Sequence, residues 1–213
     1  DGLADFYDLD SDNDGINDIA VGAPSSNPLP QAGGVYLLSG AVLGEQQNSA
    51  LSVSPALIRI ITSDSDSNTG FGRSIAAGED LDQDGTGDIV IAAPDGQTAN
   101  GAILGFSGAT GERLFRWQQS SDSDSSNCDF RSAYGTGLAF AGDTDGDGVS
   151  EIIVGDPTYD TADACNAGKV YLNKYNGVEN DPTLLFSFTG ETLNSNLGLH
   201  VGSISDMNQD GFQ

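Results

Sequence analysis

The sequence predicts an all-β fold, a segment of β-propeller built from four-stranded antiparallel blades with an acidic loop between the first and second strands of each blade. Three observations predict it. An aspartate-rich loop recurs along the chain, short apolar runs stand at fixed places after it, and Gly, Pro, Asp and Ser separate the runs without any helical periodicity. Regular repetition of four-stranded units is typical of propellers, in which radial packing buries both faces of each sheet.

The acidic loop carries Asp-Gly at its fifth and sixth positions. Its copies span residues 10–18, 80–88, 143–151 and 206–213. The fifth-position aspartates are spaced by 70, 63 and 63 residues, at Asp14, Asp84, Asp147 and Asp210. This constancy favours a structural repeat over chance clustering of acids.

Three further markers keep the same order. An aromatic or apolar residue followed by glycine precedes each later loop, at residues 71–72, 134–135 and 197–198. An apolar run ending in proline follows each complete loop, at residues 19–24, 89–94 and 152–157, and a third run opens at Gly34, Gly101 and Gly168. The markers predict blades at about 1–62, 63–118 and 119–188, and the start of another at 189–213. Because propellers need about four to eight blades, we expect this segment to be part of a larger ring.

The second unit shows the four predicted strands most clearly, at residues 71–78, 88–93, 101–107 and 113–117. Equivalent fourth strands are predicted at 56–61 and 184–188. The turns before the fourth strands contain Ser39-Gly40, Ser107-Gly108 and Asn176-Gly177, and are predicted to be tight hairpin turns with positive φ.

The charge of the chain argues for metal ligands and against two classes of partner. The formal net charge is −25, which disfavours nucleic acids and anionic membranes as partners. No apolar run is long enough to predict membrane insertion of this segment. Only six of the 32 acidic residues are glutamates. Aspartate is the acid that a tight loop uses to bring its own oxygens around a hard cation.

The spacing of the loops predicts Ca²⁺ as the cofactor. Calcium takes about six to eight oxygens, which carboxylates at positions one, three, five and nine and a carbonyl at position seven can supply. The predicted ligands are Asp10, Asp12, Asp14, Ile16 and Asp18; Asp80, Asp82, Asp84, Thr86 and Asp88; Asp143, Asp145, Asp147, Val149 and Glu151; and Asp206, Asn208, Asp210 and Phe212. Ordinary Asp-Gly turns on an acidic surface are the alternative. An EF-hand is disfavoured because the loops lead into β-branched strands rather than helices.

Through Phe71-Gly72, the aspartate loops and the Gly-Ala-Pro at residues 22–24, the sequence resembles the FG-GAP repeats of integrin-α-like propellers. The resemblance covers essentially the whole chain and implies a rigid, calcium-bearing platform for adhesion or ligand binding. Two departures stand out. The first unit lacks the aromatic-Gly strand, and its loop is also similar to thrombospondin type 3 calcium repeats. The third loop has Glu151 at its ninth position, where Asp is usual.

The two cysteines lie in the third unit. Cys128 precedes its first strand and Cys165 joins its second and third strands, and these connections emerge on one face of a blade. We therefore predict a Cys128–Cys165 disulfide, with two free buried thiols as the alternative. His200, the only histidine, falls within a predicted strand as a packed or edge residue, and Trp117 is predicted to lie in the core.

The sequence predicts a non-catalytic, extracellular or cell-surface module that binds a protein or glycan ligand, or copies of itself. Calcium near millimolar concentration outside cells would fill even weak sites. An accessory domain of a secreted hydrolase or lyase, or a calcium-dependent spacer in an extracellular filament, remains the alternative. Asp95, Asp156 and Asp160 could form an acid–base pair, but their spacing does not require it.

Overall fold

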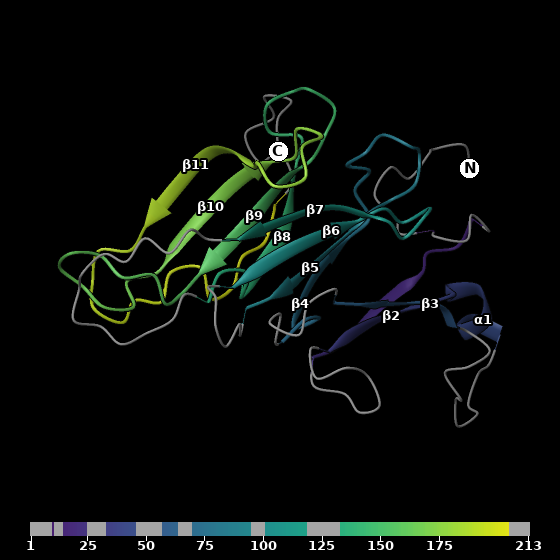
Figure 1. The fold of residues 1–213 in the computed structure, drawn as a ribbon, viewed down its shortest axis with the longest axis horizontal. Helices are drawn as coiled ribbons and strands as arrows, with labels where there is room; N and C mark the ends of the chain where they lie inside the picture. Colours follow the sequence, from purple (N-terminus) through teal and green to yellow (C-terminus); the bar gives the residue numbers. More distant parts are fainter. Residues whose placement is uncertain are drawn as a thin grey trace.

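The computed structural model describes residues 10, 15–24, 33–45, 57–63, 70–94, 101–118 and 133–204. Within them, three antiparallel sheets follow one another in chain order and lie side by side (Figure 1). The predicted all-β fold of propeller blades is therefore confirmed. Within the same residues, no helix combines the length and apolar character needed to cross a membrane.

Each sheet is a meander in which consecutive strands pair. The first contains β1 (Ile19–Ala23), β2 (Gly34–Leu38) and β3 (Leu57–Thr62). The second contains β4 (Ser74–Ala77), β5 (Ile89–Ala93), β6 (Ala102–Phe106) and β7 (Arg113–Gln118). The third contains β8 (Gly137–Gly142), β9 (Glu151–Asp156), β10 (Lys169–Lys174) and β11 (Thr183–Thr189). The described part of the first unit thus has three strands, and the next two units have four.

One of the predicted tight turns is wrong, and a second is present but has its positive φ at another residue. A short helix, α1 (Gly40–Glu45), follows Ser39, and the turn after β6 places its positive φ at Gly111 rather than at Gly108. Gly40 and Gly108 are required for a different reason, because a Cβ on either would lie 1.9 Å from the carbonyl oxygen of Asn17 or Gly87, respectively. The third turn is as predicted, with Gly177 at a φ of 79°.

The core lies between the sheets. Side chains alternate along a strand, so Ile89 and Ile91 of β5 face the first sheet while Val90 and Ala92 face the third. All five residues of β5 are buried as a result. The middle sheet therefore joins two separate hydrophobic clusters, one at each boundary.

The outer strands of the second and third sheets differ in how far they are covered. Trp117 of β7 is 1% exposed and stacks on Phe115 with ring centroids 4.0 Å apart. Strand pairing makes Phe188 and Phe186 of β11 their equivalents, yet these rings are 57% and 60% exposed. The third sheet covers the first pair, with Tyr175 lying 5.2 Å from Phe115 between centroids.

Glycines set the spacing between neighbouring units. A Cβ on Gly22 would lie 1.9 Å from the carbonyl oxygen of Gly72 in the next unit, and one on Gly155 would lie equally close to that of Gly198. Ala92 holds the corresponding place in the second unit, against Gly135. Small residues, Gly22, Ala92 and Gly155, thus lie against a glycine of the next unit at the same position of each repeat.

Candidate metal centres

The acidic loops join the first and second strands of their units. Residues 80–88 connect β4 to β5, and residues 143–151 connect β8 to β9. In the second loop, Asp80 accepts hydrogen bonds from the amides of Asp84 and Gly85, at 3.1 and 2.9 Å. The loop curls around its first carboxylate, which accepts hydrogen bonds from the backbone of the loop itself.

The first three loops share one hydrogen bond. The amide of the sixth-position glycine donates to the first-position aspartate, at 2.8 Å in the first and third loops and 2.9 Å in the second. Each of these glycines has a positive φ, which a residue with a side chain adopts at a cost. The pairs are Gly15 with Asp10, Gly85 with Asp80, and Gly148 with Asp143.

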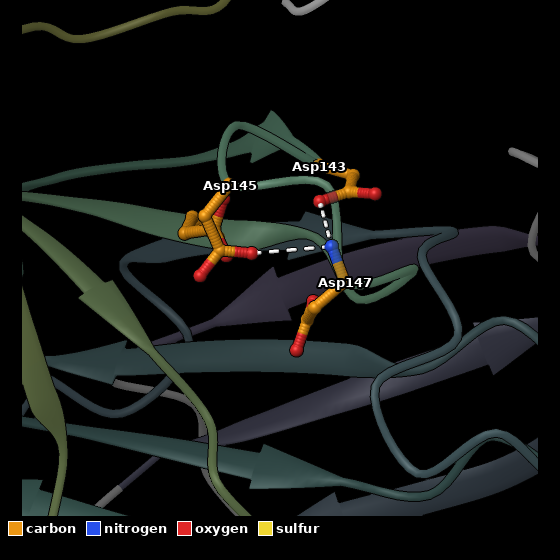
Figure 2. A group of neighbouring side chains, drawn as sticks. Asp143, Asp145 and Asp147 are labelled. Carbon is orange, nitrogen blue, oxygen red and sulfur yellow. Dashed lines mark hydrogen bonds between the residues drawn. The ribbon is translucent and has the colours of Figure 1, made fainter.

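Loop 143–151 brings four acids together. Asp143, Asp145, Asp147 and Glu151 each offer an oxygen, and these oxygens lie within 4.8 Å of one another. Figure 2 shows the amide of Asp147 donating to Asp143 and Asp145, at 3.1 and 3.3 Å. Without a cation, so many carboxylates in so small a space repel one another.

Glu151 has one oxygen without a partner. Its side chain is fully buried, and Oε2 accepts hydrogen bonds from the amide and hydroxyl of Thr144. Oε1 is buried and makes no hydrogen bond. Burial raises the pKa of this carboxyl, while the hydrogen bonds from Thr144 oppose the rise. A buried, unsatisfied carboxylate oxygen is costly unless a cation occupies the site.

Loop 80–88 brings together the oxygens of Asp80, Asp82 and Asp88, again within 4.8 Å. Its ninth residue, Asp88, is fully buried and accepts from the amides of Leu81 at 2.8 Å and Gly108 at 3.0 Å. Burial raises the pKa of Asp88 to about 7, and these hydrogen bonds limit the rise. Asp18 repeats the second contact by accepting from the amide of Gly40 at 3.2 Å. In these two loops, the carboxylate at the ninth position therefore also connects the loop to the segment that follows β2 or β6.

Several predicted ligands lie outside these clusters. Asp84 is not in the close group of its loop, and its Oδ1 accepts from the amide of Thr86 at 2.9 Å. Asp10, Ile16 and Asp18 are described, and Ile16 is 49% exposed. The carbonyl ligands Ile16, Thr86 and Val149 stay predictions. Asp12, Asp14, Asp206, Asn208, Asp210 and Phe212 lie outside the described residues.

The sequence did not predict one charged residue that contacts the third loop. The ammonium of Lys174, the last residue of β10, lies 2.6 Å from Oδ2 of Asp145 and 2.5 Å from Oδ2 of Asp147. The hydrogen bond from Lys174 is the main reason that the pKa of Asp147 is lowered. An open pocket of about 570 Å³ adjoins this contact and is lined by residues of both loops, including Asp82.

The other residues singled out in the sequence do not contribute to the acidic clusters of the described loops. Asp156 is fully buried and accepts from the amide of Ala133 at 3.0 Å, and Asp160 accepts from the amide of Asn166 at 2.6 Å. Both carboxylates thus hold backbone in place, and Asp95 lies outside the described residues. His200 is exposed in a bend, so its predicted place in a strand is wrong. Trp117 lies in the core, as predicted.

The predicted disulfide stays a prediction. Cys165 lies in the connection between β9 and β10, and the described residues contain no free thiol. Cys128 lies outside the described residues.

Comparison with known proteins agrees with the architecture. The FG-GAP repeat family matches residues 71–106 and 134–172, which hold most of the second and third sheets. The chain is 32% identical over 147 residues to integrin alpha-5 of Xenopus laevis and 35% identical over 153 residues to integrin alpha-IIb of Homo sapiens. Each alignment covers 68% of this chain but 14% of the relative. The chain therefore contains FG-GAP repeats and is an integrin-α-like segment of β-propeller.

Proposed function

We propose that this segment is a calcium-stabilised, non-catalytic propeller module of an extracellular or cell-surface protein. The observation that carries the proposal is the recurrence of one acidic loop geometry in consecutive units, with the buried Oε1 of Glu151 lacking any other partner. A cation in the loop would satisfy that oxygen and relieve the repulsion among the carboxylates.

The donor set favours calcium among common metals. Both clusters consist of carboxylates alone, and hard oxygen ligands suit calcium or magnesium rather than zinc or copper. Magnesium retains several waters and is rarely held by an all-protein cage. Asp143, Asp145, Asp147 and Glu151 would hold the ion in the third loop, and Asp80, Asp82 and Asp88 in the second. The bound ion would supply charge neutralisation and a fixed loop shape, not a reaction.

The similarity to integrin α-subunits supports a role in recognition. We propose that the surface of the module binds a protein or glycan ligand, or another copy of the module, in adhesion or extracellular assembly. Sites of modest calcium affinity would be filled outside the cell and largely empty in the cytosol, which supports an extracellular location.

Calcium is expected to raise the melting temperature of the chain. A site at about 100 times its dissociation constant adds about 2.7 kcal/mol, which for a chain of this size is roughly 5–10 °C per site. Thermal unfolding in millimolar calcium, in millimolar magnesium and after chelation measures this effect. Equal melting temperatures in calcium and chelator would overturn the proposal.

An Asp80→Asn change is expected to weaken calcium binding in the second loop on the order of tenfold, because one ligand charge is lost. Calcium titrations followed by the NMR signals of the Gly85 and Gly148 amides separate the loops, since each amide donates to the first carboxylate of its own loop. The calcium concentration at the midpoint of the Gly85 titration should rise, while the midpoint for Gly148 should not change. The control is Asp163→Asn, which changes an exposed acid outside the loops. It should change neither titration midpoint.

We also propose that Cys165 pairs with Cys128. Alkylation of the unreduced, denatured chain should label neither cysteine, whereas prior reduction should allow both to be labelled, as read by mass spectrometry. Labelling of either thiol without reduction would contradict the bond.

A further inference from the structure

Lys174 departs from its own repeat. Strand pairing aligns the units, because Leu38, Phe106 and Asn173 each pair with the first isoleucine of the run after the acidic loop. The next residues are therefore equivalent, and they are Ser39, Ser107 and Lys174. The third unit alone among these places a lysine beside its acidic loop.

The exchange changes the charge at the candidate site. In the second unit, burial and the charge of Asp84 raise the pKa of Asp82, and a hydrogen bond from the neutral Ser107 opposes that rise. In the third unit, the ammonium of Lys174 contacts Asp145 and Asp147, two of the four converging acids. The lysine side chain is only 19% exposed. One loop is thus flanked by a hydroxyl and the other by a positive charge.

A cation on the protein acts against a cation from solution. The ammonium already neutralises one of the four acidic charges, and its tether keeps it near the loop at every calcium concentration. A divalent ion entering the loop must displace the ammonium or tolerate its repulsion at a separation of a few Å. Either event subtracts from the free energy of calcium binding. The same contact reduces carboxylate repulsion while the loop is empty.

We propose that Lys174 is a built-in competitor of calcium in loop 143–151, which weakens calcium binding there and stabilises the metal-free loop. The inference rests on the proposed calcium binding. It gives the third unit a site that fills at higher calcium than the same loop would without the lysine, and a loop that keeps its shape when calcium is withdrawn.

The test replaces Lys174 by the serine of the other units. In the whole chain, calcium titrations of Lys174→Ser are followed by the Gly148 and Gly85 amides. We expect the Gly148 midpoint to fall on the order of tenfold, with the Gly85 midpoint unchanged. In chelator, the melting temperature of the variant should be lower than that of the unaltered chain, because the repulsion is no longer offset.

Lys169→Ser is the matched control. Lys169 lies on the same strand, with its ammonium 4.8 Å from the ring centroids of Tyr159 and Tyr171. The variant loses the same charge away from the loop, so the Gly148 midpoint should stay within about twofold of the original. A fall as large as that of Lys174→Ser would overturn the inference by showing a general effect of net charge.

The reciprocal change, Ser107→Lys, tests the idea in a second loop. It should raise the Gly85 midpoint on the order of tenfold and leave Gly148 in place. Unchanged Gly148 binding in Lys174→Ser, with calcium still bound, would overturn the competitor role alone. Absence of any calcium response at Gly85 and Gly148 in the unaltered chain would instead overturn the proposed calcium function, and the inference with it.

Discussion

Truncation of Trp117 to alanine is expected to lower the free energy of unfolding by about 3–5 kcal/mol, as for other large aromatic residues in a core. The indole is 1% exposed, stacks on Phe115 and lies in the cluster between the second and third sheets. Its removal leaves a cavity between two sheets whose backbones are held in contact elsewhere, so the gap cannot close freely. Chemical denaturation in saturating calcium measures the loss.

Phe188→Ala is the control that the repeat itself supplies. Phe188 occupies the equivalent place on β11 but is 57% exposed, so its truncation should cost less than about 1 kcal/mol. Equal losses for the two variants would contradict the view that burial between sheets, rather than position in the repeat, gives Trp117 its importance.

Gly155→Ala is expected to destabilise the chain by about 1–3 kcal/mol, the usual cost of overpacking when the backbone must move. The new Cβ would lie 1.9 Å from the carbonyl oxygen of Gly198. No side-chain rotation relieves a clash between a Cβ and a backbone oxygen. Denaturant midpoints and the dispersion of amide signals from residues 197–204 would report the loss and its location.

Gly202→Ala provides the comparison for that substitution. It is close in sequence, has no heavy atom within 4 Å of an added Cβ and does not have a positive φ. The free energy of unfolding of this variant should stay within about 0.5 kcal/mol of that of the unaltered chain. If Gly155→Ala were equally neutral, the close contact between units would not determine their spacing.

The predicted strands come close to the observed ones because each depends on a local signal. The run 88–93 was expected from its β-branched residues and proline stop, and β5 spans Ile89–Ala93. The sequence does not predict the helix α1 or the place of the positive φ in the turn after β6. At both places a glycine is required because a carbonyl oxygen of the acidic loop lies too close for a Cβ. This close approach cannot be predicted from the local sequence pattern.

The candidate site was predicted in part. Spacing alone placed Asp143, Asp145 and Asp147 on one side of a loop, since neighbouring residues determine that curl. Lys174 was missed because it lies 27 positions beyond Asp147 in the sequence and contacts it only through the pairing of β9 with β10. Aligning the units strand by strand would have revealed a lysine where the other two have serine.

The glycine contact between units also bears on how such a chain can be rearranged genetically. Gly72 belongs to the aromatic-Gly signature of one unit, and Gly22 belongs to the Gly-Ala-Pro signature of the unit before it. The two signatures therefore form the two sides of one contact, and the second and third units carry one side for each neighbour. Tandem duplication of a whole repeat keeps both signatures in the array, whereas an insertion that lacks either signature leaves one contact without its small residue, a glycine or the Ala92 of the second unit. Duplication of whole repeats therefore keeps the contacts between units that this structure contains.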